Sequence, residues 1–107
     1  MASDLSFVEF IVEQMGNSGF LSFKKMFGEY AIYYDRKVIA LLCDNQLFLK
    51  PTLAGRQMID MVDEAPPYPG AKLYFRITEH IDDRDWLQEL VLVTAKELPE
   101  PKPKKSK

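Results

Sequence analysis

The chain contains one cysteine and one histidine in 107 residues, and this scarcity excludes several classes of site. Cys43 has no second cysteine with which it could form an internal disulfide. Together with His80 it supplies too few ligands for a structural zinc site, which takes four. The chain also lacks the glycine-rich loop that cradles phosphate groups in nucleotide-binding proteins. We therefore expect no metal ion and no cofactor.

Long apolar runs are missing as well. No stretch approaches the ~18 consecutive apolar residues that a membrane-spanning helix needs. The N-terminus carries Asp4 and Glu9 and lacks the basic segment before an apolar run that marks a secretory signal. We therefore expect a cytoplasmic protein with no membrane segment. The length suits a single domain, and 47% apolar with 28% charged residues is typical of globular proteins.

The formal net charge of -2 conceals an asymmetry. Residues 1–95 contain nine Lys/Arg against fourteen Asp/Glu, whereas residues 96–107 contain five Lys against two Glu. An acidic body is a poor surface for nucleic acid, because cationic contacts to phosphate dominate that affinity. Residues 99–107, PEPKPKKSK, are too polar to pack, so we expect a domain over 1–98 followed by a disordered tail. The tail either keeps the protein soluble or binds nucleic acid through Lys102, Lys104, Lys105 and Lys107.

Helical spacing of apolar residues predicts a first helix near the N-terminus. Ser3 or Asp4 can cap its start, and Gly16 with Asn17 can end it, because both tolerate left-handed backbone angles. The residues that recur on one face are Leu5, Val8, Val12 and Met15.

A run of strands follows, because β-branched and aromatic residues are enriched after residue 21. Asp35-Arg36 and Asp44-Asn45 stand where tight turns are needed, which predicts an antiparallel meander. Thr52 then caps a second helix predicted over residues 53–64, in which Gly55 costs about 1 kcal/mol relative to alanine. The strand candidates are SFKKMF, EYAIYY, KVIALLC and QLFLK.

The last third of the chain predicts an extended segment, a strand and a helix. APPYPGA reads as an edge segment and turn because its prolines lack backbone donors, and KLYFRIT reads as a strand. The acidic residues 82, 83 and 85 favour helix capping over a cation site, since the other ligands of a calcium loop are missing. The order is helix, three strands, helix, one or two strands, helix. We expect an α+β fold with one antiparallel sheet of about five strands and helices packed against it.

The residues that most often carry catalysis have no supporting motif. His80 precedes the last helix and has no nucleophile nearby in the sequence, and Cys43 lies inside an apolar strand. We interpret His80 as a loop residue and Cys43 as a small buried hydrophobe. We therefore expect no catalytic residues and a protein that is not an enzyme.

The stretch KKMFGEYAIYYD raises the alternative of an aromatic platform for nucleic-acid bases. The base-stacking motif requires glycine where this chain has Met26 and an aromatic residue where it has Glu29, so the pattern fails. The stretch is better read as the entry to a sheet, in which Phe27 packs and Gly28 permits a bend.

The same stretch resembles the N-terminal domain of the TfoX/Sxy family of regulators linked to bacterial natural competence. The shared pattern is Met-Phe-Gly, a tyrosine-bearing strand, an acidic turn, an apolar strand and a Leu-x-Leu-Lys strand end. Full-length regulators carry a second, helical domain where this chain has its lysine tail, so we expect a stand-alone N-terminal domain. Glu29 and Ala31 also replace glycines that are frequent in the family. The matching residues are Met26, Phe27, Gly28, Tyr30, Asp35, Ala40, Asp44, Leu47, Leu49 and Lys50.

The resemblance implies an α-β(3)-α-β(2)-α fold like that of secretion-chaperone-type domains. It also implies a role in transcriptional activation through protein contacts alongside the cyclic-AMP receptor protein, with no catalytic residues. The expected partner is therefore a protein such as a transcription regulator. The chain itself is expected to be a monomer, or a homodimer paired at the sheet edge near APPYPG. The expected partner-binding residues are Lys24, Lys25, Glu29, Tyr30 and Lys50.

Overall fold

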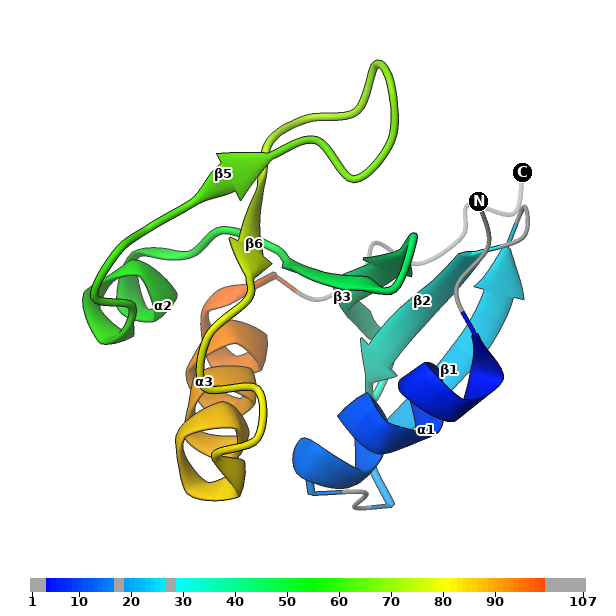
Figure 1. Cartoon of the computed structure of the whole chain (residues 1–107). Coiled ribbons are helices and arrows are strands. Elements are labelled where there is room, and N and C mark those ends of the chain that lie inside the picture. The colour runs from blue at the N-terminus through cyan, green and yellow to red at the C-terminus, as the bar shows by residue number, and fades with distance from the viewer. Residues whose placement is uncertain (1–3, 17–18, 27–28, 100–107) are drawn as a thin grey trace, which may run out of the picture.

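A computed structural model describes residues 4–16, 19–26 and 29–99, and in these ranges it contains three helices and six strands (Figure 1). The family-block residues Phe27 and Gly28 and the lysines of the expected tail lie outside the described residues. The elements in chain order are α1 (Leu5–Gln14), β1 (Leu21–Met26), β2 (Glu29–Tyr34), β3 (Lys37–Cys43), β4 (Gln46–Leu49), α2 (Leu53–Met58), β5 (Glu64–Ala65), β6 (Tyr74–Ile77) and α3 (Arg84–Glu97).

All six strands form one antiparallel sheet in the order β1-β2-β3-β4-β6-β5, which confirms the α+β prediction. The strand count differs from the expected five, and four strands rather than three precede α2. The extra strand in the meander arises because β1 pairs with β2 along its whole length, from Leu21 to Met26. The segment before the prolines adds the short β5, which pairs with β6.

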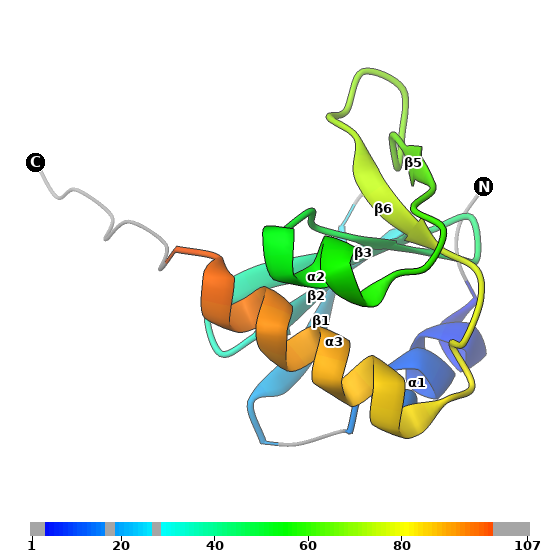
Figure 2. The same ribbon diagram turned by 90° about the vertical axis from the view of Figure 1, so that its left-hand side faces the viewer.

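The core lies on one face of the sheet, between the strands and the helices α1 and α3 (Figures 1 and 2). Cross-strand pairs place Ile32, Ala40, Leu49 and Phe75 in one row on this face. The helices contribute the matching apolar stripe. Its fully buried members are Val8, Ile11, Leu87, Leu90 and Val91. In α1 the predicted Val8, Val12 and Met15 are buried, whereas Leu5, expected on the same face, is 50% exposed.

The predicted hairpin turn between β3 and β4 is confirmed by its backbone angles. Asp44 and Asn45 have φ of 54° and 58°, the pair of positive values that a type I′ turn requires. The Asn45 side chain also accepts a hydrogen bond from the Asp4 backbone N–H at 2.8 Å. Asp4 is the N-cap of α1, although its own side chain makes no capping bond, so the β3–β4 turn holds the start of that helix.

Helix α2 ends at Met58 and is therefore shorter than the predicted helix over residues 53–64. Its start is as expected, since the Thr52 Oγ1 atom accepts a hydrogen bond from the Gly55 N–H at 2.9 Å. After Met58 the chain becomes extended so that Glu64 can pair with β6, where it also forms an ion pair with Arg56 at 2.7 Å. Residues 59–64 have only a weak amphipathic pattern, so tertiary pairing with β6 decides their structure rather than their local helix propensity.

A second group caps α2 from the far end of the chain. The Glu97 carboxylate, on the last turn of α3, accepts hydrogen bonds from the backbone N–H groups of Leu53 at 2.8 Å and Ala54 at 3.0 Å. These two hydrogen bonds lower the pKa of Glu97, and the bond from Ala54 contributes more than the bond from Leu53. Two helices that contact each other are thereby joined through the orphan donors of the shorter one.

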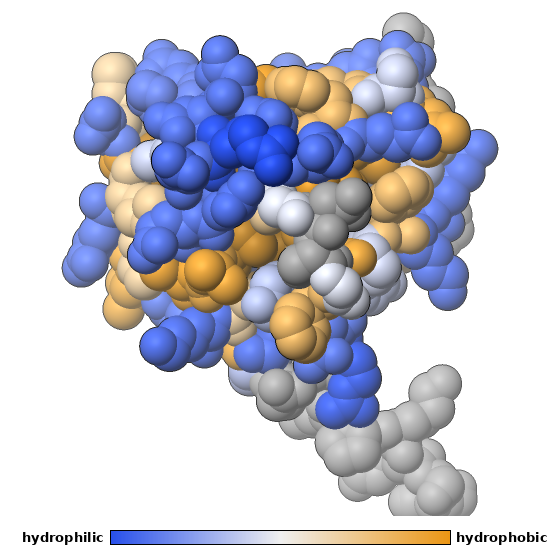
Figure 3. All heavy atoms as spheres, turned by 90° about the horizontal axis from the view of Figure 1, so that it is seen from below, coloured by the Kyte–Doolittle hydropathy of each residue, from blue (hydrophilic) through white to orange (hydrophobic). Residues whose placement is uncertain are grey.

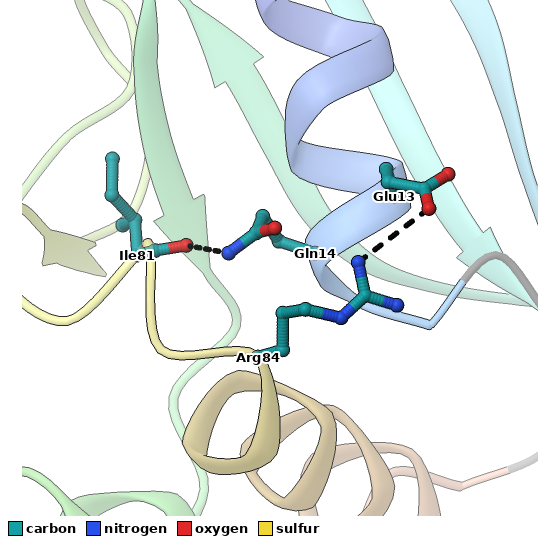
Figure 4. Close-up of polar contacts among 4 residues, drawn as sticks. All are labelled: Glu13, Gln14, Ile81 and Arg84. Atoms are coloured by element: carbon teal, nitrogen blue, oxygen red, sulfur yellow. Dashed lines mark hydrogen bonds and ion pairs between the residues drawn. The ribbon is translucent and has the colours of Figure 1, made fainter.

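Polar contacts fasten α1 to the beginning of α3 (Figure 4). The Gln14 Nε2 atom donates a hydrogen bond to the Ile81 carbonyl at 3.1 Å, and Arg84 pairs with Glu13 at 3.5 Å. Helix α3 itself begins as predicted, with the Asp83 carboxylate accepting a bond from a backbone N–H of its first turn. Seen from this end of the molecule in Figure 3, hydrophilic residues form a band beside exposed hydrophobic residues.

Candidate functional site

The face of the sheet that points away from α1 and α3, which we call the outer face, carries its own apolar residues. The pairing register places Lys24 opposite Ala31, and Ala31 opposite Leu41, so these three side chains share the outer face. Leu41 in turn lies opposite Phe48, which is buried although it is not part of the helix-side core. The outer face is therefore partly apolar and partly covered.

A cavity of about 390 Å³ lies over the outer face at the end of β1 and the start of β2. Tyr68, from the connection between β5 and β6, forms one of its walls. A volume of this size falls at the small end of the range typical of ligand-binding pockets. The other lining residues are Met26, Glu29, Tyr30, Ala31, Leu41 and Cys43.

Cys43 is buried at this cavity, as predicted, and its surroundings favour the neutral thiol. Burial is the main cause that raises the pKa of Cys43 to about 11, and the negative charges of Glu29 and Asp44 add to the shift. A thiol is a nucleophile only as the thiolate, so this position is poorly suited to covalent chemistry at neutral pH.

Alkylation should therefore be slow in the folded protein. At pH 8 we expect iodoacetamide to modify Cys43 at least ~100-fold more slowly than in the denatured chain, because a pKa near 11 leaves roughly one thiol in a thousand ionised. The rate should rise as the pH approaches 11. Because the folded state favours the neutral thiol, Cys43 contributes fully to stability below pH 9. This contribution is lost as the pH rises towards 11. Mass spectrometry of timed reactions measures the rate, and equal rates in folded and denatured protein would contradict the assignment.

Four of the five predicted binding residues gather where β1 passes into β2, but they divide between the two faces. Lys24 lies on the outer face, whereas Lys25 pairs with Tyr30, and both of these side chains lie on the helix side. Glu29 accepts a hydrogen bond from the Asp44 N–H at 3.2 Å, which connects β2 to the β3–β4 turn. Lys50 follows β4, three strand spacings and thus about 14 Å from β1.

Tyr30 lines the cavity and also stabilises the fold through its packing. Its ring lies 5.8 Å from the Phe23 ring in an edge-to-face arrangement and packs against the helix-side core. Sequence reasoning did not identify Tyr68, Leu41 or the exposed Met26 as members of the site. Tyr68 joins them only through the β5–β6 connection, and no local pattern signals a contact between segments so distant in sequence.

His80 lies on the connection before α3, as predicted, with an unusual φ of 66° and its ring 5.2 Å from the Trp86 ring. It lines a second cavity of about 380 Å³, separate from the one that Cys43 lines. The single histidine and the single cysteine therefore do not share a site. Among the residues that the structure describes, no three His, Cys, Asp or Glu side chains form a group that could hold a metal ion.

None of the described helices has the length and apolar character needed to cross a membrane.

Known proteins include sequences similar to this chain. The family model of the TfoX N-terminal domain matches residues 13–97. An uncharacterized 12.7 kDa protein in the trpE 5′ region of Spirochaeta aurantia is 45% identical over 107 residues, which cover 100% of this chain and 93% of that protein. The match spans the meander, α2 and α3 and confirms the resemblance seen in the sequence: the chain belongs to the TfoX N-terminal domain family.

Proposed function

We propose that this protein is a non-enzymatic protein-interaction domain of the cytoplasm that acts as an accessory to transcriptional regulation. Membership of the TfoX N-terminal domain family supports the link to transcription. The observation that carries the interaction role is the apolar cavity on the outer face, beside the exposed Lys24 and Met26. An apolar recess within a charged rim is the usual anatomy of a protein-binding surface.

The site offers a partner two kinds of contact. Met26 is 40% exposed and Tyr68 is 57% exposed. Both side chains therefore have apolar surface that is removed from water when a partner covers the cavity. Lys24 adds a cation on the same face of the sheet, directly opposite Ala31. A partner that places an apolar side chain in the cavity and a carboxylate at Lys24 would satisfy both.

The experiment is a tagged pull-down from native cell extract, using the full chain and a 1–98 truncation, each with and without nuclease. We expect a protein partner that survives both nuclease and truncation, and its identity tests the link to transcription. Recovery that vanishes with nuclease, or with the tail, would instead favour the alternative of a nucleic-acid-associated protein that binds through its basic tail.

Site variants make the pull-down specific. Lys24→Glu and Tyr68→Ala should each reduce recovery of the partner, because they remove the cation and one wall of the cavity. Lys72→Glu and Leu92→Ala are matched controls, since both residues are exposed and neither lines the cavity. Equal recovery with site and control variants would show that the outer face is not the binding surface.

A further inference from the structure

The two edges of the sheet differ in what they offer to another chain. In the part of the chain that the structure describes, β1 is an edge strand that pairs with β2 over six residues. The opposite edge, β5, has two residues and runs directly into Pro66 and Pro67. Prolines and shortness protect an edge from further pairing, whereas a six-residue edge presents a row of backbone donors and acceptors. The β1 edge is thus the one able to accept another strand.

The side chains of β1 are unusually exposed for a strand with so many apolar residues. Every residue from Ser22 to Met26 is exposed, including Phe23 at 37% and Met26 at 40%. Lys24 and Lys25 point to opposite faces of the sheet, so the edge is cationic on both sides. The strand itself contains no acidic residue. Glu29 lies opposite Met26 on β2, where it accepts a hydrogen bond from the Asp44 N–H.

This charge pattern argues against a second copy as the occupant. If two β1 strands paired about a twofold axis at their centre, Lys24 and Lys25 of one copy would lie close to the same residues of the other. Like charges on neighbouring strands destabilise the pairing, and edge lysines are a common means of preventing self-association. The complementary occupant is therefore a strand that carries carboxylates.

We propose that β1 binds an extended acidic segment of a partner protein by strand addition, with one large apolar side chain of that segment in the cavity beside Met26. This inference rests on the proposed function and specifies the chemistry of the partner. Main-chain hydrogen bonds along the edge give affinity in this mode of recognition, and a pocket for an alternate side chain gives specificity.

The register of β1 specifies a short pattern for the bound segment. Residues opposite Met26 and Lys24 share the outer face, and the residue opposite Lys25 lies between them on the other face. The added strand lies about 4.8 Å from β1, so a long apolar side chain opposite Met26 can reach the cavity that Met26 lines. The expected core is one large apolar residue followed or preceded by two consecutive acidic residues.

Synthetic peptides test this pattern directly. Labelled peptides of about twelve residues carry Leu-Glu-Glu, or the reversed Glu-Glu-Leu, within a flanking sequence of threonine and valine. Fluorescence anisotropy with the full-length protein should show saturable binding to at least one order, at least ~10-fold tighter than to the matched Leu-Lys-Lys or Ala-Glu-Glu peptides. Binding should weaken as salt is raised, because the edge lysines are exposed.

Backbone N-methylation distinguishes strand addition from any other way of binding. Methyl groups on alternate residues block the N–H groups that face β1 in one set and those that face solvent in the other. We expect one set of methylated peptides to bind and the other to lose binding at least ~10-fold. Amide NMR shifts should change mainly in β1 and at the cavity. Equal binding of both sets would overturn strand addition.

Charge-reversed protein variants complete the test. The double variant Lys24→Glu/Lys25→Glu should bind the acidic peptide at least ~10-fold more weakly, and the Leu-Lys-Lys peptide more tightly. The control Lys72→Glu/Lys96→Glu has the same net charge at exposed positions that lie outside β1 and do not line the cavity, and it should bind nearly as the unmodified protein does. Circular dichroism verifies that both variants fold. A control that loses as much affinity as the edge variant would overturn the proposal.

The pull-down separates failure of this inference from failure of the proposed function. A protein partner that the Lys24→Glu/Lys25→Glu variant captures as well as the unmodified chain does would refute strand addition and leave the interaction role intact. The absence of any captured protein, together with peptides that do not bind, would refute both. Self-association through β1, seen as concentration-dependent mass that acidic peptide cannot reduce, would assign the edge to a second copy and overturn the proposal.

Discussion

Replacing Phe75 by alanine should lower the free energy of unfolding by about 3–5 kcal/mol. Phe75 lies in the middle of β6, between β4 and β5, and is 1% exposed. It is the largest of the fully buried side chains, and the Arg56 guanidinium lies 5.4 Å from the centre of its ring. Removing the ring loses its burial and leaves a void that neighbours on a paired strand can fill only in part.

Urea denaturation followed by circular dichroism measures this loss for Phe75→Ala. The matched control is Tyr68→Ala, because Tyr68 is also aromatic but 57% exposed. We expect the control to change the free energy of unfolding by no more than about 0.5 kcal/mol. A loss below about 1 kcal/mol for the Phe75 variant would mean that the core does not close around this ring as the structure shows.

The second large effect is expected from Gly55→Val in α2. A Cβ atom at this position would lie 2.7 Å from the Thr52 Oγ1 atom, closer than non-bonded contact allows, and 3.5 Å from both Leu90 and Thr94 on α3. The branched side chain would displace the capping hydroxyl and overpack the α2–α3 contact. Loss of a cap costs about 1 kcal/mol and overpacking costs about 1–3 kcal/mol, so we expect destabilisation by about 2–4 kcal/mol.

A double-mutant cycle with Thr52→Ala tests the cause. If the clash with the Thr52 hydroxyl is responsible, Gly55→Val should cost clearly less in the Thr52→Ala background than alone. Gly19→Val is the control, since a Cβ atom at Gly19 meets nothing within 4 Å. Purely additive effects of the two substitutions at α2 would point to overpacking against α3 rather than to displacement of the cap.

Gly55 also shows where sequence reasoning gives the wrong sign. By helix propensity alone glycine weakens this helix relative to alanine. In the structure the missing Cβ leaves the space in which Thr52 caps the helix and α3 packs. Propensity describes an isolated helix, whereas the contact with α3 depends on residues about 40 positions away, which no local pattern encodes.

Short sequence patterns predict those features that depend only on neighbouring residues, such as turns and helix caps. The turn at Asp44-Asn45, the cap at Thr52 and the helix that begins after Asp83 were all predicted from short patterns and are confirmed. The end of α2 and the bounds of β5 differ from the prediction, because both depend on pairing with β6. The extended edge segment was expected at APPYPGA, whereas the strand lies at Glu64–Ala65. Long-range pairing, rather than weak propensity, accounts for these differences.

The candidate site divides in the same way. The β1–β2 end was singled out from its sequence pattern, and four of the five predicted residues do lie there. Their division between two faces follows from the register of β1 against β2, which the sequence pattern alone does not specify. The cavity was missed because Tyr68 reaches it from the β5–β6 connection. The binding role of these residues remains a prediction that the experiments above test.

The cap that Glu97 places on α2 has a consequence for the order in which the protein can fold as it is synthesised. Chains generally fold from the N-terminus during translation, and the β1–β4 meander consists of neighbouring strands that can pair as they emerge. Helix α2 is made before its cap, which arrives 44 residues after Leu53. Until α3 is complete, α2 lacks this cap and the helix-side face of the sheet lacks Leu87, Leu90 and Val91. Until residues 84–97 are available, the helix-side face of the β1–β4 meander is therefore covered by α1 alone, the state in which chaperone binding or aggregation is most favoured.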